Sequence, residues 1–241
     1  MYLARARNPL VSAGRRVYAL VPIKDPAKGK VRLAPLMSPA ERYELCLFFA
    51  WRTLETCAAA FGTDRTIVVT ASAEVADFAQ SLGVKLVAED PPGCGLDPAL
   101  ALGCARARLD GAEALLVVPT DLPFASVEEL RAVSAAIPAA PGCLLVPDRR
   151  NTGTNLLGLA PARGDLFAFG EHSLRRHSAL AAGAGCEVRL YENQMLALDV
   201  DLPEDFSAWR SRPGWPDRES RRAASESFAQ PRARRAMEKN P

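Results

Sequence analysis

Short apolar segments alternate with segments of helical character along most of the chain, and this alternation restricts the fold more than any other feature. Residues 17–23 form the first apolar segment, which stops at Lys24 and is predicted to be a fully buried strand. Seven further strands are expected at residues 66–70, 85–88, 114–118, 143–146, 155–159, 187–191 and 196–200. Helices are expected between them at residues 38–60, 73–82, 98–109, from Ser126 onward, 173–182 and 203–209. This order predicts an α/β fold with a mixed, mostly parallel sheet and helices on both faces.

The chain is long enough for one domain with a sizeable core. Of its 241 residues, 49% are hydrophobic, which suits a single α/β domain. We expect an N-terminal arm at residues 1–16, the domain at 17–209, and a basic, disordered tail at 210–241, where Pro, Arg and Ser are frequent. No apolar run approaches the roughly 20 residues that cross a bilayer, and the N-terminus lacks the apolar block of a secretory signal. We therefore expect a cytoplasmic protein with no membrane partner.

Charge and cysteine usage argue against nucleic-acid-binding, disulfide-linked and zinc-binding proteins. The formal net charge is only +2, and much of the positive charge lies near the two ends, so no nucleic-acid partner is expected for the folded part. The six cysteines form no C-x-x-C pair, which favours free thiols over disulfides or a zinc site. The sequence leaves the oligomeric state open, a homodimer included.

A basic loop follows the first predicted strand. It contains four cations within nine residues, namely Lys24, Lys28, Lys30 and Arg32. Open α/β sheets bind ligands at the carboxyl ends of their strands, and such cations hold phosphates. The loop is therefore a candidate anion site, although a solvated basic loop would have the same composition.

Three aspartates lie at the ends of predicted strands. Asp121 lies directly after a strand in V-V-P-T-D-L-P, where an unpaired carboxylate is costly and a hard cation with oxygen ligands would stabilise it. A helix cap is the alternative, but Ser126 already serves that role. Asp199 and Asp201 are two residues apart on an expected extended segment, so both would point to one side and repel each other without a cation. Asp201 could instead cap the helix that begins at Pro203, and the two roles are compatible.

Two polar segments offer further donors for an anion. D-R-R-N-T-G-T-N at residues 148–155 contains hydroxyls and backbone amides in a turn, and F-G-E-H-S at residues 169–173 opens a helix. Helix N-termini bind anions, although an ordinary helix start can have the same residues. His172 and His177 lie in this region, and surface or packing roles suit them better than metal ligation because no His or Cys partner has suitable spacing.

Five motifs follow one another along residues 17–209. They are V-P-I-K with K-V-R-L-A-P, T-D-L-P, D-R-R-N-T-G-T-N, F-G-x-x-S-x-x-x-H and L-D-V-D-L-P-E-D. In this order they resemble the 2-phospho-L-lactate guanylyltransferase family. The resemblance implies a single-domain nucleotidyltransferase with a Rossmann-like sheet of the GT-A type. It also implies transfer of GMP from GTP to 2-phospho-L-lactate, phosphoenolpyruvate or 3-phospho-D-glycerate, with release of pyrophosphate, in coenzyme F-420 biosynthesis.

The resemblance also implies roles for individual residues. Mg²⁺ would be held by three carboxylates, those of Asp121, Asp199 and Asp201. The acceptor acid would be contacted by Lys24, Thr154, Gly170 and Ser173. The nucleoside would lie near Gly95, Leu96 and Asp97, where relatives often carry Gly-Leu-Asn and this chain lacks the donors of the Asn amide.

The chemistry follows from the charges of the reactants. The acceptor phosphate attacks the α-phosphorus of the nucleotide, and it is already ionised at neutral pH, so no general base is needed. Two anions must approach each other, and we expect Lys24, with Lys30 or Arg32, to neutralise the charge that develops.

Other interpretations stay open at this point. A nucleotidyltransferase of the molybdenum-cofactor type usually carries a Gly-rich L-x-G-G-x-S-x-R loop after the first strand. This chain reads V-P-I-K-D-P-A-K-G-K-V-R-L at that position, which disfavours this type. A glycosyltransferase-like or non-catalytic nucleotide-binding module would show a lost metal carboxylate, yet all three are present. An RNA-interacting role of the basic tail is disfavoured by the near-neutral charge of the folded part.

Overall fold

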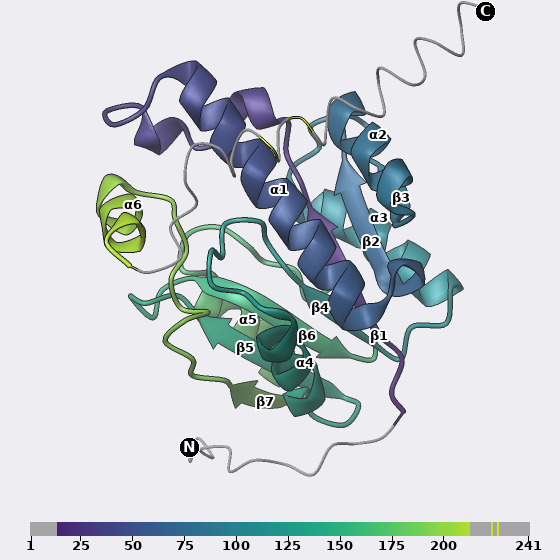
Figure 1. The fold of residues 1–241 in the computed structure, drawn as a ribbon. Helices are drawn as coiled ribbons and strands as arrows, with labels where there is room; N and C mark the ends of the chain where they lie inside the picture. The colour runs from purple at the N-terminus through teal and green to yellow at the C-terminus, as the bar shows by residue number, and fades with distance from the viewer. Residues whose placement is uncertain (1–13, 213–222, 224–225, 227–241) are drawn as a thin grey trace, which may run out of the picture.

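One sheet forms the centre of the structure. The computed structural model describes residues 14–212 together with Ala223 and Glu226. Within these residues the strands are β1 (Val17–Pro22), β2 (Thr66–Thr70), β3 (Lys85–Ala88), β4 (Ala114–Val117), β5 (Gly142–Pro147), β6 (Thr154–Ala160) and β7 (Glu187–Leu190). Their order across the seven-stranded sheet is β3-β2-β1-β4-β6-β5-β7 (Figure 1).

The direction of the strands brings several loops to one edge of the sheet. All neighbouring strands run parallel except β6, which is antiparallel to both β4 and β5. The predicted mixed, mostly parallel sheet is therefore confirmed. Because β6 runs against β4, its first residue, Thr154, lies where β1 and β4 end. We call this the carboxyl edge, and it is the edge at which open α/β sheets bind ligands.

Helices cover both faces of the sheet (Figure 1). They are α1 (Pro39–Phe61), α2 (Ala73–Leu82), α3 (Leu96–Leu109), α4 (Val127–Ala136), α5 (Ser173–Gly183) and α6 (Pro203–Arg210). Successive side chains of a strand point to opposite faces. Ala19 and Val21 of β1 therefore join the core beneath α1, α2 and α4, whereas Tyr18 and Leu20 join the core beneath α3 and α5. Burial on both faces explains why the central strands are continuously apolar.

A third apolar cluster holds the loop after β1 against α6. It contains Leu33 of the 3-10 turn η2 (Val31–Leu33), residues 45–49 of α1, the segment before α6 and the apolar face of α6. Phe49 stacks on Trp209 with ring centroids 5.1 Å apart, and Leu33 and Val200 are fully buried in the same cluster. The cluster brings the basic loop close to the segment that carries Asp199 and Asp201.

The strand predicted at residues 196–200 is wrong, because this segment forms a turn followed by irregular backbone. The side-chain oxygen of Asn193 accepts hydrogen bonds from the backbone N–H groups of Met195 and Leu196 at 2.8 and 3.1 Å. The N–H of Val200 donates to the carbonyl of Asp121 at 3.0 Å. The asparagine thus directs a turn where the apolar pattern alone favours a strand.

The other element boundaries agree with the predicted ones to within two residues. The capping box predicted at the start of α1 is confirmed, since Ser38 and Glu41 exchange side-chain-to-backbone hydrogen bonds.

Most of the predicted arm and tail, residues 1–13, 213–222, 224–225 and 227–241, lies outside the described residues. Among the helices that the structure describes, none is both long and apolar enough to cross a membrane.

Candidate active site

Lys30 joins two of the predicted carboxylates at the carboxyl edge. Its ammonium group donates to Oδ2 of Asp121 at 2.9 Å and to Oδ1 of Asp201 at 2.8 Å. The Lys30 side chain is only 9% exposed, and its ammonium lies 5.7 Å from the centre of the Phe49 ring. The structure therefore brings together three residues from three separate segments of the chain.

Opposite charges keep this group ionised despite its burial. Burial acts to lower the pKa of Lys30, but the carboxylates of Asp121 and Asp201 outweigh it and raise that pKa well above its ordinary value. Burial likewise acts to raise the pKa of Asp201, but Lys30 outweighs it and holds that pKa below its ordinary value. Arg32 and Lys24 contribute to the same lowering, so these two exposed cations lie within electrostatic reach of Asp201.

Asp199 lies beside this ion pair with one carboxylate oxygen unsatisfied. Its Oδ1 atom is buried and has no hydrogen-bond partner among the described residues. Burial, followed by the charges of Asp121 and Asp201, raises the pKa of Asp199 to about 6. A buried carboxylate that is crowded by two others is a group whose charged form an added cation would stabilise.

Lys30 supplies the positive charge between Asp121 and Asp201. In the part of the chain that the structure describes, no three Asp, Glu, His or Cys side chains are arranged to hold a metal ion as they stand. A divalent ion at this place would therefore have to share carboxylate oxygens with the lysine. The sequence predicts that Lys30 or Arg32 neutralises the charge that develops on the phosphates, and of these two Lys30 has its ammonium group engaged by two carboxylates.

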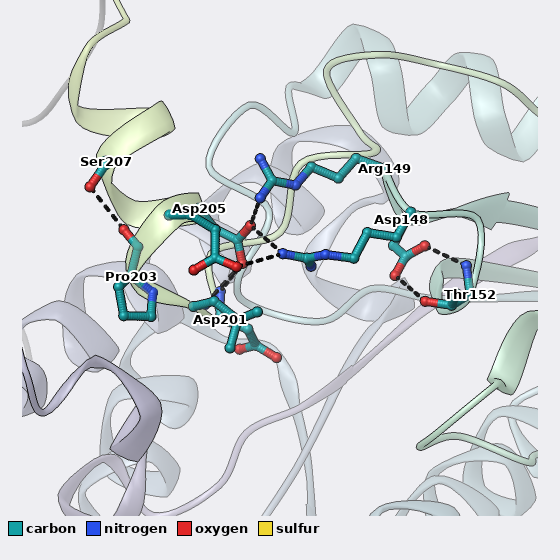
Figure 2. Close-up of polar contacts among 10 residues, drawn as sticks. Asp148, Arg149, Thr152, Asp201, Pro203, Asp205 and Ser207 are labelled. Atoms are coloured by element: carbon teal, nitrogen blue, oxygen red, sulfur yellow. Dashed lines mark hydrogen bonds and ion pairs between the residues drawn. The ribbon is translucent and has the colours of Figure 1, made fainter.

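Asp205 fixes the backbone that carries Asp201 (Figure 2). Its side chain is fully buried, and its Oδ1 atom pairs with Arg149 at 2.5 Å and with Arg150 at 3.3 Å. Its Oδ2 atom accepts hydrogen bonds from the backbone N–H groups of Asp201 and Leu202 at 3.3 and 2.8 Å. The alternative that Asp201 caps the helix at Pro203 is therefore excluded. Asp205, at the third position of α6, caps the helix instead and leaves the Asp201 carboxylate free to face Lys30.

Helix α1 supports the loop of Asp121 from the other side. The hydroxyl of Thr53 donates to the carbonyl of Thr120, and Arg52 donates to the carbonyl of Ala125, both at 3.3 Å. Both hydrogen bonds fix backbone on either side of Asp121, so α1 restrains the loop that carries this aspartate.

A second polar cluster is formed where β6 and α5 begin. The backbone N–H of Thr154 donates to Oγ of Ser173 at 2.9 Å, and the hydroxyl of Thr154 lies 2.9 Å from Nδ1 of His177. All three side chains are buried. The neighbouring Asn155 donates to the carbonyl of Leu196 at 2.9 Å, which links this cluster to the segment of Asp199. Two of the predicted acceptor-binding residues, Thr154 and Ser173, therefore lie side by side.

The loop predicted to lie near the nucleoside is connected to the same cluster. Oδ1 of Asp97 accepts a hydrogen bond from the backbone N–H of Phe169 at 3.0 Å. Gly95, at the N-cap of α3, has φ +100°, and Leu96 is 38% exposed. Gly170 follows Phe169 with φ +109°, a backbone conformation that strongly favours glycine. The carboxylate of Asp97 thus holds the backbone that leads into Gly170.

His177 makes the folding free energy depend on pH. Burial, with a smaller contribution from Arg176, lowers its pKa to about 4, whereas an unfolded histidine titrates near 6.5. As pH falls below about 6.5, the unfolded chain binds a proton that the folded chain does not, so stability is lost until about pH 4. We expect the free energy of unfolding, measured in urea, to fall less between pH 7 and pH 5 in His177→Gln than in the wild type. Equal losses would mean that the folded protein protonates His177 as readily as the unfolded chain does.

Two residues of the site, Asp205 and His177, were not predicted to take part in it. Asp205 lies three residues after Leu202, which is the spacing of an acidic residue that caps the start of a helix, so L-D-V-D-L-P-E-D contained the signal. His177 is four residues after Ser173 and therefore shares its face of α5, a relation that the motif F-G-x-x-S-x-x-x-H also contained.

Comparison with known proteins identifies relatives along the whole domain. The family model described as "Guanylyl transferase CofC like" matches residues 17–208. The chain is 38% identical to a phosphoenolpyruvate guanylyltransferase of Sphaerobacter thermophilus over 188 residues, which are 78% of this chain and 89% of that protein. It is 34% identical to a phosphoenolpyruvate guanylyltransferase of Rubrobacter xylanophilus over 191 residues, 79% of this chain and 92% of that protein.

Solved structures share the fold at much lower identity. A nucleotidyl transferase from Methanothermobacter thermautotroptrophicus superposes with a TM-score of 0.59 at 19% identity, covering 82% of this chain and 97% of that chain. A cytidylyltransferase from Leptospira borgpetersenii superposes with a TM-score of 0.52 at 12% identity, covering 91% of this chain and 96% of that chain. The α/β architecture with its carboxyl edge is thus that of nucleotidyltransferases.

Proposed function

The chain belongs to the guanylyl transferase CofC-like family and is therefore a nucleotidyltransferase, and from this premise we propose that it transfers GMP from GTP to a phosphorylated three-carbon acid. Pyrophosphate is the leaving group, and the product serves coenzyme F-420 biosynthesis. Phosphoenolpyruvate is the first candidate acceptor because the relatives described above are named for it. 2-Phospho-L-lactate and 3-phospho-D-glycerate are the other candidates. The observation that carries the proposal is that Lys30 joins Asp121 and Asp201 at the carboxyl edge, within electrostatic reach of Asp199.

The chemistry of the three aspartates suits a divalent cation such as Mg²⁺, which would have to take over carboxylate oxygens that Lys30 now contacts. All of their donor atoms are oxygens, which hard cations prefer, and Oδ1 of Asp199 is buried without a partner among the described residues. When bound, the ion would stabilise negative charge on the phosphate oxygens as a Lewis acid. Lys30 keeps the carboxylates of Asp121 and Asp201 close together, which lowers the cost of gathering three negative charges.

The remaining residues bind and orient the two substrates. Lys24 and Arg32 are exposed cations that act on Asp201 through their charge, so they are available to hold phosphate groups at this edge. Thr154, Gly170 and Ser173 hold the acceptor acid, and the loop from Gly95 to Asp97 lies near the nucleoside. The acceptor phosphate is ionised at neutral pH and needs no proton acceptor. His177 is not placed to act as a general base, because it is buried and its Nε2 atom already accepts a hydrogen bond from the backbone N–H of Ala168.

A pyrophosphate-release assay tests the proposal directly. Four nucleoside triphosphates are each combined with phosphoenolpyruvate, 2-phospho-L-lactate and 3-phospho-D-glycerate in the presence of Mg²⁺. We expect release with GTP and at least one of the acids, and formation of a guanylylated acid by mass spectrometry. Release with CTP alone, or with GTP only when a molecule of another class is the acceptor, would contradict the proposed function.

Lys24→Ala is expected to weaken binding of the acceptor acid more than binding of the nucleotide. One charge-assisted contact at an exposed site corresponds to about 1.4 kcal/mol, so KM for the acid should rise roughly tenfold while KM for GTP changes less than twofold. Steady-state kinetics with each substrate varied in turn measure both values. Lys28→Ala is the matched control in the same loop, because its side chain is 81% exposed and 3.7 Å from Asp25. A larger rise in KM for GTP would assign Lys24 to the nucleotide.

A further inference from the structure

A histidine that the proposed chemistry does not use lies directly behind Thr154. His177 is 1% exposed and lies on α5, one turn after Ser173. Its Nδ1 atom is 2.9 Å from Oγ1 of Thr154, and its Nε2 atom accepts a hydrogen bond from the backbone N–H of Ala168 at 3.0 Å. The ring of Phe169 packs edge-on against it with centroids 4.7 Å apart. The imidazole is therefore held on both nitrogens and along its face.

The contact with Ala168 fixes the tautomer of the ring. A backbone N–H can only donate, so Nε2 must be the unprotonated nitrogen. The ring is neutral at pH 7 because burial lowers its pKa to about 4, and its one proton is therefore on Nδ1. Nδ1–H then donates to Oγ1 of Thr154. The other tautomer would place two buried donors against each other at Ala168, which is costly.

This tautomer determines what the Thr154 hydroxyl can do. Its oxygen accepts from His177, so its own hydrogen is directed elsewhere. The same holds for Ser173, whose Oγ accepts from the N–H of Thr154 at 2.9 Å. Neither hydroxyl has another hydrogen-bond partner within the described residues. Two adjacent hydroxyls are thus left as donors, which is the polarity that suits the oxygens of a carboxylate or phosphate.

We propose that His177 is a positioning residue that commits the Thr154 hydroxyl to donating a hydrogen bond to the anionic acceptor. The imidazole does not touch the acceptor, and acts only through Thr154. A phosphorylated acid presents mainly acceptor oxygens, so a hydroxyl committed to donation favours it over neutral ligands. The identity of the ligand rests on the proposed function, whereas the tautomer and the direction of the hydroxyl rest on the contacts of His177 alone.

Two isosteric substitutions separate positioning from a purely structural role. The side-chain nitrogen of Asn reaches the place of Nδ1, so His177→Asn retains a donor to Thr154 and loses the acceptor for Ala168. The side-chain oxygen of Gln reaches the place of Nε2, so His177→Gln retains the acceptor for Ala168 and loses the donor to Thr154. We expect KM for the acid to rise roughly tenfold in His177→Gln and less than threefold in His177→Asn, with KM for GTP unchanged in both. Equal rises in both variants, or the reverse order, would overturn the proposal.

A double-mutant cycle tests whether His177 acts through Thr154. Thr154→Val removes the hydroxyl and keeps the shape of the side chain. Once the hydroxyl is absent, His177→Gln should change KM for the acid by less than twofold, because the two residues form one unit. Independent, multiplying effects would show that His177 acts by another route.

Nitrogen NMR of the ring gives a result that does not depend on turnover. His172 is the only other histidine in the chain, so a ¹⁵N-labelled His172→Gln protein shows the signals of His177 alone. We expect the Nδ1–H tautomer at pH 7, and a shift of its resonance on titration with phosphoenolpyruvate that Thr154→Val abolishes. An Nε2–H tautomer, or a resonance that neither phosphoenolpyruvate nor inorganic phosphate moves, would overturn the inference. Failure of the proposed function would instead appear as normal ring signals without GMP transfer to any acid.

Discussion

Asp121→Ala is expected to lower kcat for GMP transfer by roughly 10³-fold, which is the effect of about 4 kcal/mol of lost charge stabilisation. Asp121 is one of the two carboxylates that Lys30 joins, and its charge acts on Asp199. Without it, the proposed cation loses one of three ligands and Lys30 keeps only Asp201. Substrate binding should change much less, because no contact with either substrate is assigned to Asp121.

The measurement is kcat with GTP and the preferred acid at increasing Mg²⁺ concentration. The kcat of Asp121→Asn should lie between those of the wild type and Asp121→Ala, since the amide retains one oxygen but no charge. Asp64→Ala is the control, because Asp64 is exposed and precedes β2, at the edge of the sheet opposite the site. Turnover by Asp121→Ala within tenfold of the wild type, at the same Mg²⁺ requirement, would contradict the metal assignment.

The fold could be predicted from the sequence because its signals are local. The central strands are buried on both faces and are read directly as apolar runs, and helix starts such as Ser38 carry their own capping residues. The strand predicted at residues 196–200 is the exception. There a single side chain, Asn193, redirects the backbone, and an apolar run gives no sign of such a turn.

The site could be predicted only in part. Asp121 could be predicted because it follows a buried strand at the edge where parallel strands end. Asp199 and Asp201 could be predicted because two carboxylates two residues apart repel each other without a cation, although the strand on which they were expected is not formed. The engagement of Lys30 by two carboxylates could not be predicted, since it depends on how the loop after β1 packs against α6. The fit of the aspartates to Mg²⁺ and the substrate contacts stay predictions.

Asp205→Ala is expected to cause the largest loss of stability among the polar residues near the site. Its carboxylate is fully buried, pairs with Arg149 and Arg150, and caps the backbone of Asp201 and Leu202. Breaking a buried ion pair costs about 3–5 kcal/mol, and the lower part of that range applies because both arginines are about one-third exposed and can turn to water. A loss of about 3 kcal/mol corresponds to a decrease in Tm of roughly 10 °C for a domain of this size.

Glu204 provides a matched control for this prediction, because it contacts the same Arg150 from the surface. Its side chain is 59% exposed and lies 3.2 Å from the guanidinium, so Glu204→Ala should lower Tm by less than about 2 °C. The Tm of Asp205→Asn should lie between those of Asp205→Ala and Glu204→Ala, since the amide keeps an oxygen for the backbone N–H groups and loses the charge that pairs with the arginines. Thermal unfolding of the three variants gives the order. If Asp205→Ala melted within about 2 °C of Glu204→Ala, the buried carboxylate would not be what holds the Asp201 segment in place. The position of the proposed metal ligands would then depend on the apolar cluster of Phe49, Val200 and Trp209 instead.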